Sequence, residues 1–589
     1  MGRPDRWALP LGMVLSAMPM ALAAQSTGVT TADLKVLVRD EAGRPLPGVS
    51  ISMTRMAVHD TLTGISDARG ACRLRMLPVG SYLLRATCPG MEPLGLGISL
   101  QVGSTRTLDL TLYHPTQTDV IRVFVDDASS DLERTQISKV VDESLISNLP
   151  INRRSFSDFS LTTPFVAAGN LPTGNGVPDS GLSFAGMTPR QNNFLLDGLD
   201  NNDLGGGALR ASISQEAVQE FQVISGGPSA ESGRALGGIV NTITKQGAND
   251  LRGSVFYFHR PGSLDSKSPL GTDTDDYRLT QYGASLGGPI LKDKLFYFVA
   301  VERLQKTDVN IVTIDPTAVA LISAAGFRVE TGELPYAESD TSGFLRLDWV
   351  QNPSSRWTFR ALFGYQKDEN AIPWGGLIAK TAGGSKSTHD QTFTFSNQWV
   401  GTSWFNDFRV MLASRDSRID SLDPSRSVYV EILGSAVFGT QRLTDQQSQA
   451  RYIQLADTLT TVRGNHTLKG GIDLLHSRNE ADVPQNFAGL YRFQAIPEIG
   501  ISSPLMAFAA PNPFGGTGIP VAFVQSYGNA RGRSTSKSEA VFLQDDWQLH
   551  PAFLLKLGLR FERETLPTFP ASADYDAIEH PPSTVDPVL

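Results

Sequence analysis

The chain has 589 residues and a net charge of −9, so it is long enough for several domains and carries no basic excess of the kind that binds nucleic acid. After the N-terminus no apolar run reaches the roughly 18 residues of a membrane-spanning helix, which argues against a helical membrane protein. A transmembrane β-barrel is not excluded, because its strands alternate outward apolar with inward polar residues.

The N-terminus predicts a signal peptide over residues 1–23. Arg3 and Arg6 precede the apolar run 7–20, and Ala21-Leu22-Ala23 supplies small residues for cleavage. The alternative is a buried first helix, which the polar run that follows disfavours. Because no stop-transfer helix comes later, we expect export to the periplasm, the outer membrane or the exterior.

Residues 34–113 predict a small β-sandwich, because short alternating strands are separated by turns such as residues 40–43 and 77–80. The two cysteines, Cys72 and Cys88, lie almost symmetrically about the second of these turns and match no zinc spacing. In an oxidising compartment they can pair as a disulfide. Two separately buried thiols are the alternative, and the sequence leaves both open.

Residues 192–245 predict a small α+β unit punctuated by glycines. An apolar strand at residues 194–196 breaks at Asp197-Gly198, a dipeptide that favours a turn with φ > 0. We expect a short helix over residues 214–220, capped by Ser214, followed by a strand over residues 221–224.

The last strand of this unit, residues 239–245, alternates in side-chain direction. Ile239, Asn241 and Ile243 share one face. Two glycine pairs precede the strand, and neither is followed by the Lys-Ser or Lys-Thr of a phosphate-binding loop. No nucleophile, base and orienting residue form a triad, so the sequence predicts no enzyme and no cofactor.

An acidic run after the Asp197-Gly198 turn resembles a weak calcium loop. Its members offer hard oxygen ligands at short spacing: Asp197, Asp200, Asn201, Asn202 and Asp203. The run lacks a helix–loop–helix frame and a distant bidentate glutamate. The alternative is that these side chains hold turns.

From about residue 252 the sequence predicts strands joined alternately by short and long connections. The eleven expected strands are 252–260, 279–290, 293–304, 342–351, 355–367, 390–400, 403–415, 450–460, 466–478, 537–548 and 551–563. Short turns on one side and long loops on the other are typical of an outer-membrane barrel whose short side is periplasmic.

Side-chain alternation within these strands favours a barrel over a soluble sandwich. In the strand 355–367, Trp357, Phe359 and Phe363 share a face, opposed by Arg356 and Arg360. Eight steps of about 3.3 Å from Trp357 to Tyr365 approach the roughly 25 Å apolar band of such barrels. A soluble sandwich also alternates, but it rarely places basic side chains along one face and large aromatics along the other.

Two motif sets carry a resemblance to a known family. DxxGxPLPGV from Asp40 and DxxGxxxLxxLPxGxYxL from Asp67 are similar to the carboxypeptidase-regulatory-like domain, which implies no peptidase activity. LLDGxDNND and ESGRALGGxVNxITK resemble the plug of TonB-dependent outer-membrane receptors of the Oar-like branch. The plug motif residues are Asn193, Phe194, Leu195, Leu196, Asp197, Gly198, Glu231, Gly233, Arg234, Gly237, Gly238 and Asn241.

The resemblance implies a mainly β architecture in four parts. These are a signal peptide (1–23), a β-sandwich (34–113), a small α+β plug (114–250) and the first half, about eleven strands, of an antiparallel transmembrane β-barrel (251–589). It further implies energy-coupled uptake of a scarce extracellular ligand, with the TonB–ExbB–ExbD complex, outer-membrane lipid and the barrel-assembly machinery as partners. The location would be the outer membrane of a Gram-negative bacterium, with the plug and sandwich facing the periplasm.

Two segments have roles that the resemblance suggests but does not fix. Relatives place a TonB box where this chain has Thr118, Asp119, Val120, Ile121, Arg122, Val123, Phe124 and Val125, a run that suits strand addition. An ordinary plug-entry strand is the alternative. Glu231 and Arg234 are expected to bridge plug and barrel wall, or else to form a solvated surface pair.

Eleven strands are half of the roughly 22 of outer-membrane transporters, and an open sheet leaves unpaired edges in lipid. We therefore expect the chain to be the N-terminal portion of a longer receptor. A barrel completed by a second chain and a non-functional remnant are alternatives. Another function open at this stage is a surface adhesion or assembly barrel that transports nothing.

Overall fold

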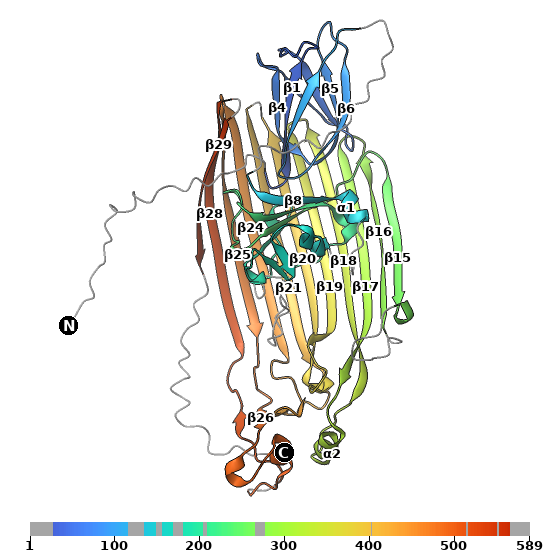
Figure 1. Cartoon of the computed structure of the whole chain (residues 1–589), viewed down its shortest axis with the longest axis vertical. Helices are drawn as coiled ribbons and strands as arrows, with labels where there is room; N and C mark the ends of the chain where they lie inside the picture. The colour runs from blue at the N-terminus through green and yellow to red at the C-terminus, as the bar shows by residue number, and fades with distance from the viewer. Residues whose placement is uncertain are drawn as a thin grey trace, which may run out of the picture.

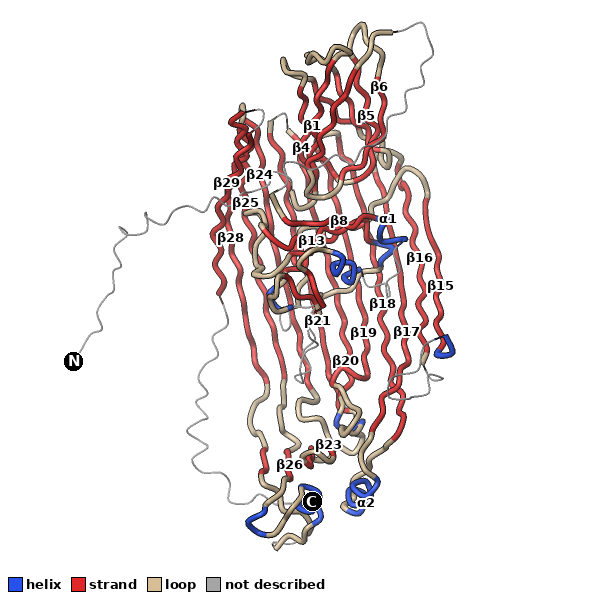
Figure 2. The backbone as a smooth tube through the Cα atoms, in the orientation of Figure 1, coloured by secondary structure: helices blue, strands red, loops and turns tan. Residues whose placement is uncertain are grey.

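The computed structural model describes residues 28–115, 135–148, 156–168, 181–203, 209–264, 277–401, 403–513, 516–550 and 553–565. The fold is mainly β, as predicted: a sandwich, a small mixed unit and a tall eleven-stranded sheet follow one another along the chain (Figures 1 and 2). The expected signal peptide and the candidate TonB box, residues 118–125, lie outside the described residues. Within the described ranges no helix is long and apolar enough to cross a membrane.

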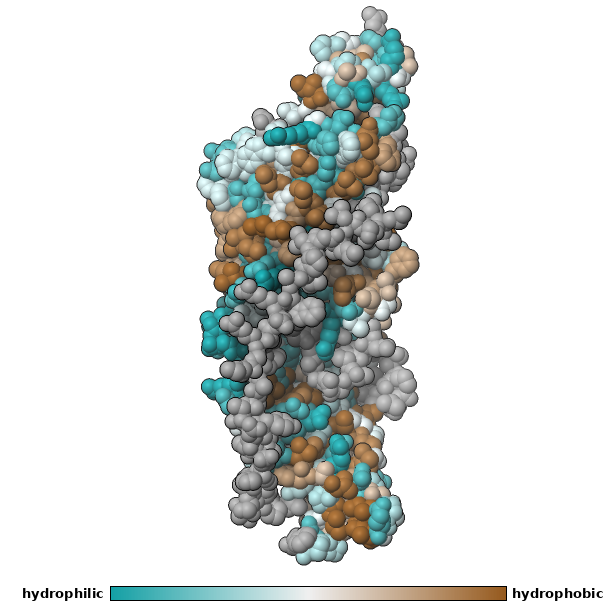
Figure 3. All heavy atoms as spheres, turned by 90° about the vertical axis from the view of Figure 1, so that its left-hand side faces the viewer, coloured by the Kyte–Doolittle hydropathy of each residue, from teal (hydrophilic) through white to brown (hydrophobic). Residues whose placement is uncertain are grey.

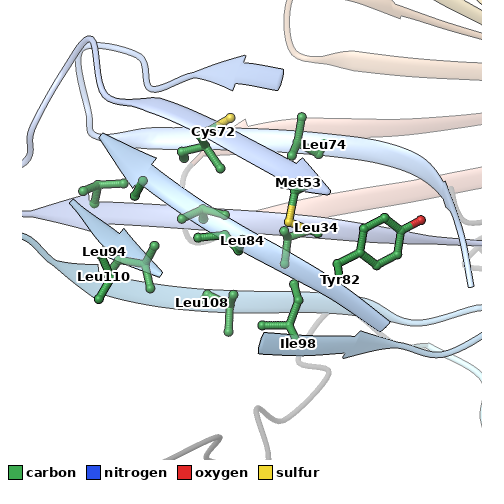
Figure 4. Packing of buried hydrophobic residues seen from close by; sticks show 14 of the residues in the cluster. Leu34, Met53, Cys72, Leu74, Tyr82, Leu84, Leu94, Ile98, Leu108 and Leu110 are labelled. Carbon is green, nitrogen blue, oxygen red and sulfur yellow. The ribbon is translucent and has the colours of Figure 1, made fainter. Parts of the chain in front are cut away.

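Two sheets form the sandwich. One contains β4 (Ala71–Pro78), β1 (Thr31–Arg39) and β7 (Thr105–Thr111); the other contains β3 (Thr61–Ile65), β2 (Ser50–Arg55), β5 (Gly80–Thr87) and β6 (Leu94–Leu100). Every second side chain is buried in β2, in β5 and in β1 from Leu34 onward, which is the pattern of two sheets packed face to face. The resulting core is apolar and includes Leu34, Met53, Tyr82, Leu84, Ile98 and Leu108 (Figure 4).

Cys72 and Cys88 are both free thiols in this sandwich, which shows no disulfide between them. Cys72 lies in β4 of the first sheet and is buried, whereas Cys88 follows β5 of the second sheet and is half-buried. Burial raises the pKa of the Cys72 thiol. Each cysteine packs against the apolar core as a small hydrophobic residue.

A five-stranded mixed sheet is the centre of the plug. Its strand order is β12 (Leu199–Asp200), β11 (Asn193–Leu196), β14 (Ile239–Thr244), β13 (Val218–Gly226) and β8 (Ile137–Asp142). The predicted turn is present, because Asp197 and Gly198 have φ of 49° and 75° and join β11 to β12 as a tight hairpin. All six residues of β14 are buried, so its predicted alternation separates two buried faces.

Short elements complete the plug, and one of them corrects a prediction. They are α1 (Glu143–Asn148), η2 (Phe156–Thr162), β9 (Val166–Ala168), β10 (Leu182–Phe184), η3 (Pro189–Gln191) and η4 (Gln215–Ala217). The helix expected over residues 214–220 is only the single turn η4, although Ser214 caps it by accepting a hydrogen bond from the backbone N–H of Glu216 at 3.2 Å. From Val218 onward the chain pairs instead with β14 and β8.

All eleven predicted strands are present in one antiparallel sheet, ordered along the chain. They are β15 (Arg252–Pro261), β16 (Arg278–Leu291), β17 (Leu295–Val312), β18 (Gly332–Asn352), β19 (Ser355–Ile372), β20 (Gly384–Val400), β21 (Trp404–Ser421), β24 (Gln446–Arg463), β25 (His466–Asp482), β28 (Arg531–His550) and β29 (Phe553–Thr565). The sheet is curved around the plug, and among the described residues β15 and β29 are its two edges (Figure 1).

Along β18, the outward face of the sheet carries large apolar side chains up to one level and loses them beyond it. On β18 the outward residues are large and apolar from Trp349 to Leu345, and from Thr341 onward none of them is a large apolar residue. The register pairs Thr341 with Arg303 on β17, so the change occurs at the same level on these two strands. On β19 it pairs Thr341 with Tyr365, the last aromatic residue before Lys367 on the outward face. Seen from the β29 side, apolar side chains gather in a patch below the sandwich and again at the opposite end (Figure 3).

Most strands continue well past this level toward the long connections. β18 has 21 residues and β28 has 20, whereas the predicted strands were about half as long. The long connections carry η5 (Gly262–Leu264), α2 (Pro316–Ala324), η6 (Lys380–Ala382), β22 (Tyr429–Ile432), β23 (Ala436–Phe438), β26 (Leu490–Phe493), η7 (Pro497–Ile499), α3 (Pro504–Ala509) and β27 (Ala522–Val524). Residues of α2, β22, β23, β26 and α3 share one apolar cluster at the loop end.

Candidate plug–wall interface

The plug lies against the concave face of the eleven-stranded sheet, here called the wall (Figure 1). One part of this contact is apolar. Phe298 and Ala300 on β17, Phe344 on β18 and Leu362 on β19 belong to the buried cluster that also forms the plug core. Toward β29 the contact is mixed. Leu199 of the plug packs in a small apolar cluster with residues of β21 and β24, and charged and polar groups surround it.

Asp197 is the first charged centre of this interface. Its carboxylate accepts hydrogen bonds from the backbone N–H of Thr244 at 2.9 Å and from the Thr244 hydroxyl at 2.8 Å, and it pairs with the Arg360 guanidinium on β19. Arg346 on β18 donates to the Thr244 carbonyl at 2.9 Å. Burial raises the pKa of Asp197, but Arg360, Arg346 and the Thr244 hydrogen bonds outweigh it, so the net pKa is lowered and the carboxylate stays ionised.

Asp200 and Arg234 form the second centre. Arg234 donates to the Asp200 carboxylate at 3.1 Å and lies 3.6 Å from the carboxylate of Asp473 on β25. The Asp200 backbone N–H donates to Gln454 on β24 at 2.8 Å, and Gln454 in turn donates to Asp473 at 2.8 Å. Arg234 of the plug therefore bridges a plug carboxylate, Asp200, and a wall carboxylate, Asp473.

Glu231 is the third centre, and its carboxylate is deeply buried, with 6% of its side chain exposed. It pairs with the Lys469 ammonium on β25 and lies 3.7 Å from the Arg409 guanidinium on β21. The Glu231 backbone N–H donates to Gln544 on β28 at 2.9 Å, and Arg560 on β29 donates to its carbonyl at 3.1 Å. The structure thus places Glu231 and Arg234 between plug and wall, with different partners.

The remaining motif residues hold the plug backbone close to its neighbours. A Cβ at Gly238 would overlap the Phe184 ring, and one at Gly233 would overlap Arg560 and Glu562. Gly237 lies against Asn192 in the same way. Asn193 donates to the Gly233 carbonyl at 2.8 Å, and Asn241 accepts from the Gly198 N–H at 3.1 Å. Phe194, Leu195 and Leu196 are buried in β11.

The calcium interpretation of the acidic run is wrong. Asp197 pairs with Arg360, Asp200 with Arg234, and Asp203 lies 3.7 Å from Arg415. Each carboxylate is balanced by a different arginine, so they do not converge on a common point. Among the described residues no group of three side chains is placed to hold a metal ion. Asn201 and Asn202 instead make local hydrogen bonds that fix the loop.

Sequence reasoning missed the wall partners of the plug. Lys469 lies 238 positions from Glu231, and Arg360 lies 163 positions from Asp197, so no local pattern links them. The available signal was weaker: basic residues recur on the inward face of strands whose outward face is apolar. That pattern indicates which residues face the lumen, but not which plug residue each one meets.

Three family models match the chain. The outer membrane beta barrel domain matches residues 243–326 and 324–576, the carboxypeptidase regulatory-like domain matches residues 33–113, and the TonB-dependent receptor plug domain matches residues 131–239.

Two curated relatives are similar to the chain. The TonB-dependent transporter Oar of Myxococcus xanthus is 24% identical over 631 residues, which cover 93% of this chain and 58% of that protein. The probable TonB-dependent siderophore receptor PirA of Acinetobacter baumannii is 27% identical over 217 residues, covering 34% of this chain and 27% of that protein. The chain therefore spans little more than half of the Oar protein.

Solved structures resemble the described fold. The outer membrane transporter YddB from Escherichia coli has a TM-score of 0.49 at 13% identity, covering 73% of this chain and 56% of that one. The siderophore receptor PirA from Acinetobacter baumannii has a TM-score of 0.48 at 15% identity, covering 73% of this chain and 57% of that one.

Proposed function

Because the chain belongs to the outer-membrane β-barrel family, with the regulatory-like and plug domains of Oar-like TonB-dependent receptors, we propose that it takes up a scarce extracellular ligand by TonB-dependent transport. The family implies the outer membrane of a Gram-negative bacterium. The candidate ligands include siderophores, glycan fragments and peptides.

The observation that carries this proposal is the polar seam between plug and wall. Asp197, Asp200 and Glu231 are bound by charged or hydrogen-bonding groups of β19, β24 and β25 rather than by an apolar core. A buried ion pair gains little net free energy, because water solvates both partners when they separate. Such a seam seats the plug specifically and still permits it to leave when water enters, as an importer requires.

The energy would come from TonB with ExbB and ExbD, driven by the inner-membrane proton gradient. TonB would capture residues 118–125 by adding them as a strand to its own sheet and would pull the plug aside. The short turns of the wall and the sandwich lie at the same end of the molecule (Figure 1), which supports a periplasmic position for both the sandwich and this segment. Barrel-assembly machinery would insert the wall into outer-membrane lipid.

Uptake by cells in which this protein is the sole receptor of its kind tests the proposal. Radiolabelled ferric siderophores, oligosaccharides and peptides are offered in turn, and the accumulated class is then followed in variants. Val123→Pro removes a backbone donor from the candidate box and should reduce accumulation to the level seen after the proton gradient is dissipated. Ser130→Pro, outside the box, is the matched control and should accumulate normally.

Surface binding separates transport from adhesion. The label bound to chilled cells should be equal in both variants, because the outer surface is untouched. Equal accumulation in Val123→Pro and Ser130→Pro, insensitive to the proton gradient, would contradict TonB-dependent uptake.

A further inference from the structure

The sandwich touches the plug through the tips of two turns. Val79, between β4 and β5, and Val102, between β6 and β7, form a small buried cluster with Ile243 of the plug, and Val140 packs against it. Neither valine belongs to the apolar core of the sandwich itself. Their burial therefore depends on the plug being in place.

Two hydrogen bonds surround this apolar contact. The Val102 backbone N–H donates to the Glu220 carboxyl group at 2.7 Å, and Gln101 donates to Asp142 at 3.2 Å. Glu220 is only 4% exposed, although it lies on the sheet of the plug. The sandwich is thus fitted to the β13–β8 side of the plug sheet.

The residues just before β1 reach further, into the seam between plug and wall. The Val29 carbonyl accepts a hydrogen bond from Asn241 of the plug, and Thr30 donates to Asp407 of the wall at 3.1 Å. At Gly198 an added Cβ would lie 2.5 Å from Val29. Two residues of the plug motif, Asn241 and Gly198, therefore also accommodate this arm, residues 28–30.

The sandwich is attached to the rim of the wall as well. Arg356, at the start of β19, donates to the Asp60 carboxylate at 2.6 Å, and Asp60 also holds the buried Arg55 guanidinium at 2.5 Å. Arg73 donates to Gln548 of β28 at 2.8 Å. These contacts are made at the short-turn end of strands on both sides of the plug.

We propose that the sandwich and its arm are a retainer for the plug, which cannot leave toward the periplasm until the sandwich has separated from it or from the rim. In Figure 1 the sandwich lies directly beyond the plug at the short-turn end. The proposal rests on the proposed function only for the direction in which the plug moves. Retention itself is a property of the resting protein.

Hydrogen–deuterium exchange of the full protein in detergent tests retention without any ligand. Val102→Asp places a carboxylate in the apolar contact and beside Glu220. Amides of β13 and β14 should then exchange about tenfold faster or more, as expected when burial of a valine is lost. Leu83→Asp on the exposed face of β5 is the matched control and should leave plug exchange unchanged.

A second variant guards against simple misfolding of the sandwich. Arg356→Gln removes one of the two rim contacts without changing any residue of the sandwich or the plug, and it should also speed exchange of β13 and β14, by a smaller factor. Unchanged plug exchange in both Val102→Asp and Arg356→Gln would overturn the proposal. Faster exchange without any TonB-dependent uptake would keep the retainer and reject transport.

Discussion

The sandwich and the plug–wall seam are both buried, but they are built from opposite kinds of residue. Leu34, Leu84 and Ile98 of the sandwich contact other apolar side chains from two facing sheets. Glu231, Lys469 and Arg409 of the seam contact one another's charges at similar burial. An apolar core gains free energy from every buried surface, whereas an ion-paired seam gains little and loses much if one partner is removed. The difference separates a domain built to stay folded from an interface built to open.

Lys469→Met should produce the largest change, because it leaves the Glu231 carboxylate buried without its ammonium partner. We expect the plug to lose about 3–5 kcal/mol of seating free energy, the usual cost of an unpaired buried charge. Exchange rates of β13 and β14 amides give the measurement. The double variant with Glu231→Leu should recover most of the loss, and additive losses would show that the two residues do not act as a pair.

Leu84→Ala truncates a core side chain of the sandwich and should lower the stability of that domain. Leu84 is fully buried among apolar neighbours, so the sandwich should lose about 3 kcal/mol of unfolding free energy. Denaturant unfolding followed at sandwich amides measures it. No double variant with a neighbour should restore stability, in contrast to the Lys469 pair; restoration would contradict the distinction between the two regions.

Gly238→Ala should destabilise the plug by steric overlap alone, because it changes no charge and removes no apolar side chain from the core. The new methyl group meets the Phe184 ring, and such overpacking costs about 1–3 kcal/mol. The expected result is a lower thermal midpoint for the plug with normal sandwich stability. Gly95→Ala, which has open space around it, is the matched control and should change neither.

The contact between sandwich and plug should weaken as pH rises. Burial raises the pKa of Glu220 to about 8, the Val102 N–H opposes this, and the neighbouring Asp142 adds to it. Because its pKa is raised, the protonated Glu220 contributes its full stabilisation of the contact below the ordinary value of 4.5. This stabilisation is lost as pH rises through about 8. Between pH 6 and pH 7 the loss is at most about 1.4 kcal/mol.

Amide exchange of Val102 and its neighbours, followed against pH after correction for intrinsic rates, measures this effect. Glu220→Gln should remove the pH dependence while keeping a hydrogen-bond acceptor for Val102. A pH profile that is the same in the variant and the parent would show that Glu220 is not the titrating group.

The sequence was sufficient for the number of wall strands but not for their length. Alternation and tight turns are local, and all eleven strands follow from them. The outward residues of β18 from Thr341 to Glu333 include no large apolar side chain, so the apolar alternation disappears there although the strand continues to Gly332. The prediction of a helix over residues 214–220 was wrong because of tertiary pairing. From Val218 onward the chain pairs with β14 and β8, which no local pattern indicates.

The candidate site could be predicted only on the plug side. Resemblance identified Asp197, Glu231 and Arg234 as plug motif residues, but it gave no partner for any of them. Their partners Arg360, Lys469 and Asp473 come from strands far along the chain, brought together by the curvature of the sheet. Pairing of this kind depends on tertiary geometry, which no spacing in the sequence encodes.

The extension of β18 beyond the change in its outward face has a practical consequence. From Gly343 to Gly332 the strand runs eleven more residues, roughly 36 Å along its path at about 3.3 Å per residue. Thr341, Ser339 and Glu333 on the outer face of this stretch suit water better than acyl chains, so we expect the wall to extend beyond the lipid at this end. An affinity tag inserted after α2, near Gly326, would therefore be displayed far from the lipid and accessible to antibodies on intact cells.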